Sequence, residues 1–442
     1  MTTQRTTAPG TERAARQVLG RDGRTVDRPV GGGSDATFPL AYVRTGPRAD
    51  VPPVVVLPGG PGLASVLPYV QLRADAARRG LDVLMVEHRG IGLSRRDASG
   101  AELPRSAVTV AAVVDDLAAV LDDAGVRRAV LYGASYGTYV AQAFGARHPD
   151  RVAAMVLDSP VLAPADDLAL SRRHRRRLLW DGALRDGDDP ALAGVAAAVH
   201  ALADDVPAAE LAHVVQVVHE FAGPDVLHRL LLARRAGRLR AVWDRVASLG
   251  AGESEGAGVP FVMEPDLVAG IMYDEVGFGL PPDGGPLDPQ LTFADAAARH
   301  AARETVTADA AADAAVTVGH DDPAGASPTR PGPTDLPAAL PAFAWPTAVL
   351  SGERDLRTPR PVAERVVDLV PGAVLVPLAA TGHSALDTHR RAALHAAHAA
   401  AVGAVPRLPA LADRLAALPR RGPSRLVGTA VTAVVRATTR HP

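Results

Sequence analysis

Cysteine and lysine are missing from this sequence, and each absence removes a group of mechanisms. There is no cysteine, so the protein has no disulfide, no thiolate nucleophile and no cysteine-based metal site. There is also no lysine, so all 47 residues counted as lysine or arginine are arginine. A Schiff-base lysine, a P-loop lysine and a serine–lysine dyad are therefore excluded as well.

Long apolar runs are absent too. No uncharged apolar stretch approaches the roughly 20 residues that a membrane-spanning helix needs. Residues 1–33 are polar, contain arginine and lack the apolar stretch of a secretory signal peptide. We therefore expect a cytoplasmic protein with no membrane partner. The formal net charge of −2 over 442 residues gives no reason to expect a nucleic-acid partner.

Short apolar segments that alternate with helical patterns predict the core of the protein. The segments are apolar without polar alternation, which is typical of parallel strands covered on both faces. Helical spacing at 108–124 and 138–147 places helices between them. We therefore predict a mostly parallel central sheet with helices on both faces. The expected strands are 40–43, 54–57, 83–86, 129–132, 155–157, 347–350 and 373–376.

The spacing of these segments divides the chain into four parts. Residues 1–34 contain three consecutive glycines and are predicted to be a flexible arm. The strands occupy 35–160 and 345–404, which we assign to one core. Between them, residues 161–344 form a large, mainly helical insertion of the kind that often serves as a cap or lid. Residues 405–442 are a C-terminal extension, in which 426–435 are expected to form a short helix.

The motif Gly133-Ala134-Ser135-Tyr136-Gly137 points most directly to chemistry. It follows a predicted buried strand and precedes a predicted helix. A serine at such a turn projects its oxygen above the sheet, where it can act as a nucleophile. The glycines are needed because side chains there would collide with the neighbouring strand and helix. The five-residue pattern alone is common, and the strand-to-helix context is what favours a nucleophile over a plain glycine-flanked loop.

A serine nucleophile needs a base and an acid, which follow it along the chain in this type of sheet. Asp355 lies just past the strand predicted at 347–350, and His383 lies just past the last strand. Both are at carboxyl ends of strands, where open α/β sheets place their sites. We predict that His383 is the general base and that Asp355 orients it.

Other residues compete for these two roles. Glu353 and Asp158 are the alternative acids, since Asp158 also ends a strand. His389, His395 and His398 fall on a predicted helix, and we expect them at the surface.

An oxyanion hole is the remaining requirement of acyl transfer. One donor should be the backbone N–H of Tyr136, the residue after the nucleophile. The other should come from Pro58-Gly59-Gly60-Pro61-Gly62, directly after a buried strand. There, Gly59 or Gly60 lets the backbone approach a substrate closely. The alternative is that this segment is only a tight turn.

Taken together, the motifs resemble those of the proline iminopeptidase family of α/β-hydrolases. The resemblance covers roughly 36–160 and 345–402, and it also includes Glu87-His88-Arg89-Gly90-Ile91-Gly92-Leu93-Ser94, Gly352-Glu353-Arg354-Asp355 and Gly382-His383. It implies the α/β-hydrolase fold, a serine–histidine–aspartate triad and release of N-terminal residues or short peptides. It also implies acidic cap residues that hold the substrate's α-ammonium group, for which Glu264, Asp274 and Glu275 are the candidates.

Two positions depart from the family pattern. Pro58 stands where the family has a histidine before Gly-Gly-Pro-Gly, and Tyr136 stands where tryptophan often follows the serine. Neither change removes a backbone donor, but both affect the acyl pocket, so a preference for proline does not follow.

The leading hypothesis is a serine aminopeptidase that acts on short peptides, with no metal and no cofactor. An esterase, lactonase or thioesterase acting on a small metabolite would use the same machinery and is the first alternative. A non-catalytic binding protein of the same fold is the second, because a fold alone does not specify a function.

Overall fold

The computed structural model describes residues 9–31, 34–48, 50–184, 187–188, 190–254, 258–317, 334–420 and 423–438. Its centre is an eight-stranded sheet in the order β1-β2-β4-β3-β5-β6-β9-β10. The strands from β4 to β10 run parallel, while β2 pairs antiparallel with both β1 and β4. The strands are β1 (Gly23–Gly31), β2 (Ser34–Thr45), β3 (Val54–Leu57), β4 (Val83–Val86), β5 (Ala129–Ala134), β6 (Val152–Asp158), β9 (Thr347–Gly352) and β10 (Val374–Leu378).

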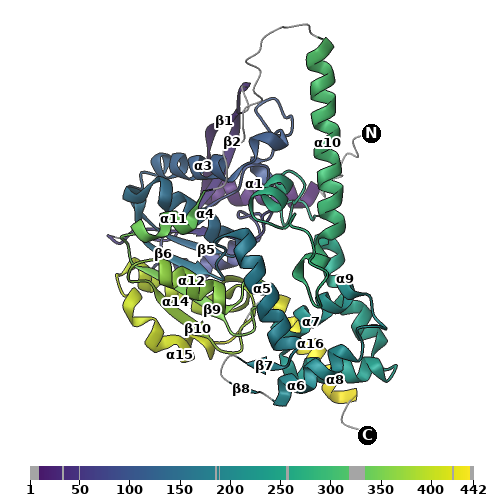
Figure 1. Cartoon of the computed structure of the whole chain (residues 1–442). Helices are drawn as coiled ribbons and strands as arrows, with labels where there is room; N and C mark the ends of the chain where they lie inside the picture. The colour runs from purple at the N-terminus through teal and green to yellow at the C-terminus, as the bar shows by residue number, and fades with distance from the viewer. Residues whose placement is uncertain are drawn as a thin grey trace.

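Two apolar layers cover the sheet, one on each face (Figure 1). Successive residues of a strand point to opposite faces. Leu131 of β5 therefore packs in one layer, while Tyr132 packs in the other. The first layer contains α3 (Val110–Asp123), α4 (Tyr136–Arg147), α11 (Leu336–Ala339) and α12 (Arg360–Leu369). The second contains α2 (Val70–Ala77), α13 (Ala385–Thr388), α14 (Arg390–Ala401) and α15 (Ala412–Ala416).

The N-terminal segment corrects the prediction of a flexible arm. Residues 9–22 form helix α1 (Pro9–Asp22), and 23–31 form edge strand β1; residues 1–8, 32 and 33 lie outside the described part. The polar composition of this segment suggested a flexible arm. It is polar because β1 lies at the edge of the sheet with its outer face in solvent. Val26, Arg28 and Val30 alternate toward the core, where Val30 is buried and Arg28 pairs with Asp116 at 3.0 Å.

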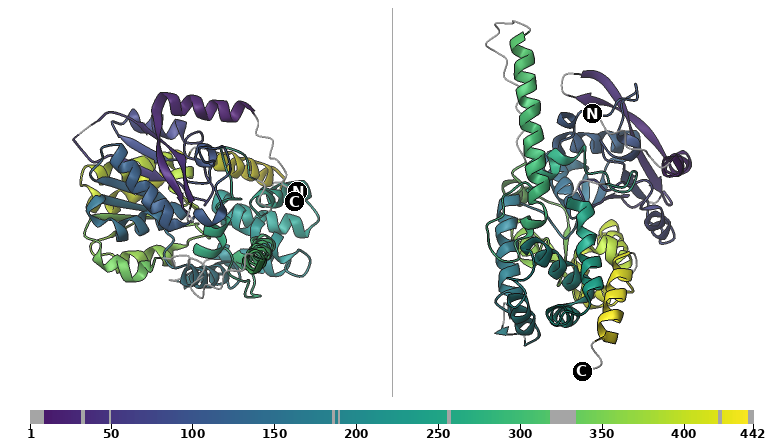
Figure 2. Two further views of the ribbon diagram at one scale, coloured as in Figure 1. Left: turned by 90° about the horizontal axis from the view of Figure 1, so that it is seen from above. Right: turned by 90° about the vertical axis from the view of Figure 1, so that its right-hand side faces the viewer.

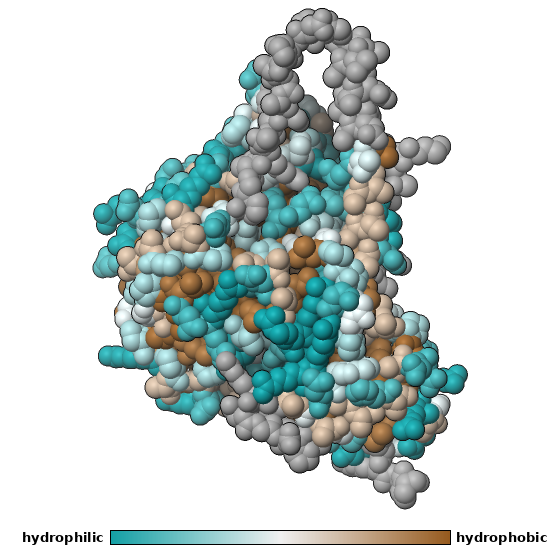
Figure 3. Space-filling view, viewed as in Figure 1, coloured by the Kyte–Doolittle hydropathy of each residue, from teal (hydrophilic) through white to brown (hydrophobic). Residues whose placement is uncertain are grey.

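The described residues of the segment 161–344 are mainly helical and contribute to an apolar core of their own, and we call this region the cap. It begins with α5 (Pro164–Leu179), on which hydrophilic side chains gather in the space-filling view (Figure 3). Helix α10 (Ala294–Thr317) projects beyond the rest of the molecule (Figure 2). The further cap elements are β7 (Ala183–Leu184), β8 (Gly187–Asp188), α6 (Pro190–His200), α7 (Ala208–Ala222), α8 (Pro224–Arg235), α9 (Arg240–Ser254) and α10 (Ala294–Thr317).

The C-terminal extension divides between the two parts of the molecule. Helix α15 packs on β10, whereas α16 (Pro423–Thr438) packs on α7 and α8 of the cap. Val431 and Val435 of α16 are buried in the apolar core of the cap. The last helix is therefore a structural part of the cap and covers its far side (Figure 1).

No helix in the described ranges has both the length and the apolar character needed to cross a membrane.

Candidate active site

Ser135 lies on a strained turn between β5 and α4. Its backbone has φ 51° and ψ −120°, an unfavourable conformation for a residue with a side chain that costs on the order of 1–3 kcal/mol. A Cβ at Gly133 would clash with the backbone of Gly137, and one at Gly137 would clash with the backbone of Leu57. The turn therefore requires glycine at both positions, which is the reason given by the sequence prediction.

His383 and Asp355 meet at the same edge of the sheet. Asp355 follows β9 and His383 follows β10, and Nδ1 of the imidazole lies 3.0 Å from both carboxylate oxygens. The backbone N–H groups of Arg357 and Thr358 donate to Asp355 Oδ1, and the Thr358 hydroxyl donates to Oδ2. The carboxylate is fully satisfied, so it fixes the orientation of the histidine ring.

The two groups change each other's ionisation. Burial lowers the pKa of His383, but the charge and hydrogen bond of Asp355 outweigh it and raise this pKa above the ordinary value of 6.5. Burial raises the pKa of Asp355, but the charge of His383 and the hydrogen bonds that the carboxylate accepts together outweigh it and lower this pKa. Asp355 therefore stays ionised and accepts from the Nδ1–H of His383. Nε2 of His383 is then the ring atom that can accept a proton.

The loop of His383 is tied to the strand next to Ser135. The Ser384 N–H donates to Ser159 Oγ at 3.0 Å, and Ser159 directly follows β6. Strand β6 pairs with β5, and the Ser135 N–H donates to the carbonyl of Asp158. Within the described residues no hydrogen bond joins Ser135 to His383, which is common in substrate-free enzymes, where catalytic contacts tighten only on binding.

The competing acids have other partners. Asp158 accepts from the backbone N–H groups of Ala385 and Leu386 and from the hydroxyl of Tyr132, so it fixes the start of α13. Burial raises the pKa of Asp158 to about 6. Glu353 is exposed and accepts from the Ala380 N–H. Neither makes a hydrogen bond with His383 in the described structure.

The glycine-rich loop after β3 lies against the proposed nucleophile. A Cβ at Gly59 would lie 3.3 Å from the Cβ of Ser135, so only glycine allows this approach without displacement. Gly60 has φ +120°, a conformation that favours glycine. A small cavity of about 40 Å³ lies beneath Gly59 and Tyr136; it is large enough for a water molecule and too small for a substrate side chain.

His88 holds the side chain of Tyr136, the residue that carries the other expected donor. Burial lowers the pKa of His88 to about 4, so the ring is neutral at pH 7. Its Nδ1 lies 2.6 Å from the carbonyl oxygen of Arg89, which can only accept, so Nδ1 carries the proton. The Tyr136 hydroxyl therefore donates to His88 Nε2 at 3.0 Å. Sequence reasoning gave His88 no role, although it lies in the segment that follows β4.

The three cap acids nominated for amine binding differ in where they lie. Glu264 is buried, and it accepts from the backbone N–H of Gly92. Glu275 accepts from the N–H of Val110, the first residue of α3. Asp274 is more exposed and pairs with His300 at 3.2 Å. Glu264 and Glu275 thus contact elements of the core, whereas Asp274 is held within the cap.

Comparison with known proteins bears on the fold. A model of the alpha/beta hydrolase fold family matches residues 52–198. The protein has the α/β-hydrolase fold.

Solved structures resemble this chain only at low similarity. A proline iminopeptidase from Mycobacterium smegmatis is 18% identical, with 86% of this chain and 99% of that chain covered and a TM-score of 0.43. VinJ is 18% identical, with 88% and 99% covered and a TM-score of 0.44. A thermophilic esterase from Thermogutta terrifontis is 16% identical, with 94% and 98% covered and a TM-score of 0.39. At this level of similarity the matches do not distinguish between substrates.

One acid beside the predicted triad was not identified from the sequence. Glu220, near the end of α7, has only 1% of its surface exposed. It accepts from the N–H of Leu356 at 3.2 Å, and its backbone and Cβ lie against Gly382. No motif surrounds it, since it lies within a cap helix, and only the docking of that helix brings it beside Asp355 and His383.

His389 is a further correction. We expected it at the surface, but only 1% of it is exposed, and burial lowers its pKa to about 4. It lies between α13 and α14, where the chain turns into the core. His395 and His398 are exposed, as predicted.

Proposed function

We propose that this protein is a serine hydrolase that works through an acyl-enzyme intermediate. The observation that supports it most is the placement of a serine in a strained turn at the same sheet edge as a buried histidine–carboxylate pair. The Nδ1–H of His383 is held by Asp355, so Nε2 is available to accept the proton of Ser135. Substrate binding must bring Ser135 Oγ and His383 Nε2 into hydrogen-bonding contact.

The reaction follows from these positions. Ser135 Oγ attacks the acyl carbon while its proton moves to His383 Nε2, and the carbonyl oxygen takes up the negative charge. The backbone N–H of Tyr136 and one from the loop at Gly59 or Gly60 would stabilise that charge. The imidazolium then gives its proton to the leaving group as the C–N or C–O bond breaks. Water repeats the two steps on the acyl-enzyme, which releases the acid and restores the serine.

Within this class we favour an aminopeptidase for short peptides. An aminopeptidase must hold a free α-ammonium group, and three carboxylates extend from the cap toward the elements that surround the site. Glu220 lies against the loops of Asp355 and His383, and Glu264 contacts the glycine-rich loop through its N–H, which donates to the carbonyl of Gly62. Burial and then the charge of Glu275 raise the pKa of Tyr136. Arg357 lies 3.6 Å from Glu220 and offsets part of its charge, so Glu264 and Glu275 are the carboxylates that favour a cationic substrate group over a neutral one.

A small-molecule esterase remains the second candidate because of what these same carboxylates already bind. Glu264 and Glu275 each accept from a core backbone N–H, and Asp274 pairs with His300. If their main purpose is to hold the cap on the core, the substrate needs no amine.

A panel of paired substrates tests the proposal. Aminoacyl, dipeptidyl and tripeptidyl p-nitroanilides are compared with the same compounds acetylated at the α-amine, and with simple p-nitrophenyl acyl esters. An aminopeptidase should prefer the free amine by about 10- to 100-fold in kcat/KM, the value of one charged hydrogen bond. Turnover of the esters alone, or equal rates on free and acetylated amides, would instead favour the esterase.

A further inference from the structure

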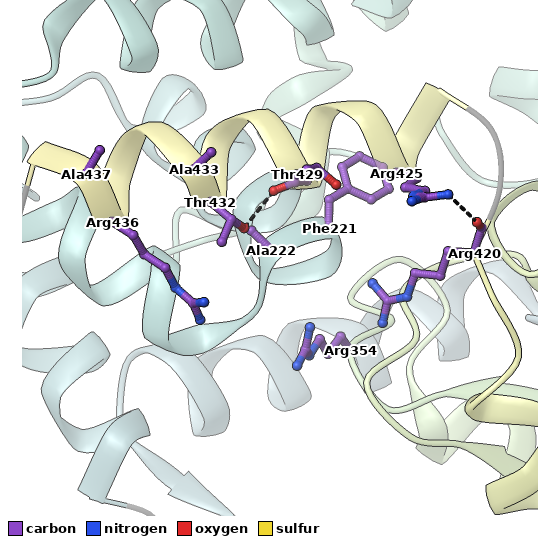
Figure 4. A pocket seen from close by; sticks show the side chains of 11 residues that line it. Phe221, Ala222, Arg354, Arg420, Arg425, Thr429, Thr432, Ala433, Arg436 and Ala437 are labelled. Atoms are coloured by element: carbon purple, nitrogen blue, oxygen red, sulfur yellow. Dashed lines mark hydrogen bonds between the residues drawn. The ribbon is translucent and has the colours of Figure 1, made fainter.

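A cavity of about 500 Å³ lies beside the C-terminal helix. It is lined by residues from the end of α7, from the loop after β9 and from α16 (Figure 4). Four of its lining residues are arginines, namely Arg354, Arg420, Arg425 and Arg436. No aspartate or glutamate is among the described residues that line it.

The arginines are only partly neutralised. In the described structure the guanidinium of Arg354 makes no hydrogen bond or ion pair, and it packs against the backbone of Gly223. Arg420 donates to the carbonyl of Ala380, and Arg425 donates to the carbonyl of Arg420 at 3.5 Å. These partners are neutral.

Among the described residues, Arg436 alone of the four arginines makes an ion pair. Its guanidinium lies 3.9 Å from Asp225, a carboxylate that Arg229 also contacts at 3.2 Å. Asp225 is exposed and does not line the cavity. The other three arginines make no ion pair with the described residues, although the charge of the exposed Glu353 acts on Arg354.

Burial makes this arrangement unfavourable when the cavity holds only water. Burial lowers the pKa of the Arg354 guanidinium. Burial and then the charge of Arg354 also lower the pKa of Arg420. Both side chains are half-buried, so solvent only partly screens the repulsion between them.

We propose that this cavity binds the phosphate group of a small phosphorylated molecule. Guanidinium groups pair with phosphate oxygens through two parallel hydrogen bonds, and a multivalent oxyanion would neutralise several of them at once. The hydroxyl of Thr429 and the ring of Phe221 also line the cavity, which leaves room for an organic part beside the phosphate. In Figure 4 the side chains of Arg354, Arg420 and Arg436 are arranged around this space.

Bound phosphate would connect the C-terminal helix to the catalytic loops. Arg354 directly precedes Asp355, and its backbone N–H donates to the carbonyl of Thr381 at 2.8 Å. Arg420 bonds the carbonyl of Ala380, in the same loop as His383. Arg425 and Arg436 belong to α16, which packs on the cap. One ligand held by all four would therefore join the cap, the extension and the loops of Asp355 and His383.

Titration calorimetry with pyrophosphate and inorganic phosphate, at constant ionic strength, tests the proposal on the full-length protein. Wild type should bind one pyrophosphate per chain, and its thermal midpoint should rise with ligand concentration. Arg354→Gln with Arg420→Gln should weaken binding at least about tenfold, since each change removes charged hydrogen bonds. Arg425→Gln, on the exposed start of α16, should also weaken binding and cannot disturb the Asp355 loop directly. Arg414→Gln on α15, exposed and outside the cavity, should bind as wild type does.

Several results would overturn it. The first is the absence of saturable pyrophosphate binding to wild type. The second is a pyrophosphate affinity of the double variant and of Arg425→Gln that equals that of wild type. The third is tighter binding of citrate than of pyrophosphate at the same ionic strength.

Discussion

The sheet edge and the cap both supply carboxylates to the candidate site, but they use them differently. At the sheet edge, Asp355 binds a histidine that it can orient and charge. In the cap, Glu220, Glu264 and Glu275 each accept from a backbone N–H of the core, at Leu356, Gly92 and Val110. The first arrangement suits proton transfer, whereas the second fixes the position of one part of the protein on another.

This difference explains how each region relates to its sequence. A residue directly after a parallel strand reaches the active edge because of the local strand-and-loop geometry. A residue in a cap helix reaches the site only through the packing of that helix. Short motifs can therefore identify the first kind and not the second.

The largest expected effect is that of Ser135→Ala. Removal of the nucleophile should lower kcat by about 10⁴-fold or more while the fold persists. Turnover of the best substrate from the paired panel and the far-UV circular dichroism spectrum measure the two quantities. Ser248→Ala on α9 is the matched control, because Ser248 is an exposed serine of the cap. Activity in Ser135→Ala close to that of the control would rule out the nucleophile.

Asp355→Asn should have the next largest effect. The asparagine cannot stabilise the imidazolium or hold the required tautomer, so kcat should fall by about 10⁴-fold. Glu353→Gln, two residues earlier in the same loop, should retain activity because the glutamine oxygen can still accept from Ala380. Steady-state rates on one substrate compare the two. If Glu353→Gln were the damaging change, the acid would be misassigned.

The pH dependence should carry the signature of the same pair. His383 acts as a base only when neutral, so kcat/KM should fall as the pH drops through its pKa. Because Asp355 raises that pKa, the midpoint of wild type should lie above 6.5. Residual activity of Asp355→Asn should show a lower midpoint, since burial alone lowers the pKa. A profile that is flat between about pH 5 and 8 would contradict a histidine base.

The cap contacts should affect stability more than chemistry. Glu275→Ala removes the acceptor for the first N–H of α3 and should lower the free energy of unfolding by about 1–2 kcal/mol. The neighbouring Asp274→Ala breaks only a partly exposed ion pair with His300 and should cost less than about 1 kcal/mol. Urea denaturation measures both. The reverse order would mean that Glu275 is not what holds α3 to the cap.

Tyr136→Phe should have the smallest effect. The backbone N–H stays, so kcat should change little, while the buried Nε2 of His88 loses its donor at a cost of about 1 kcal/mol in stability. A loss of 100-fold or more in kcat would show that the hydroxyl itself takes part in the reaction.

Much of the core could be predicted from sequence because its signals are local. Six of the seven predicted strands lie within observed strands, and the seventh, 373–376, begins one residue before β10. The glycines around Ser135 are required for the reason that the sequence predicts. The predicted helix at 426–435 lies within α16.

The remaining features depend on packing between distant segments. Residues 23–31 are polar because they form an edge strand, and the three glycines beside them suggested a linker. His389 is buried by a turn between two helices that no local pattern indicates. Glu220 lies beside His383 only because α7 docks on the core, and the sequence around it is that of an ordinary amphipathic helix.

The most direct test of the central claim is covalent labelling with a fluorophosphonate, followed by peptide mapping. The account predicts one adduct per chain on Ser135, lost in Ser135→Ala and strongly slowed in His383→Ala. Folded protein that gives no adduct, or an adduct on another serine, would contradict it and favour a binding protein built on this fold.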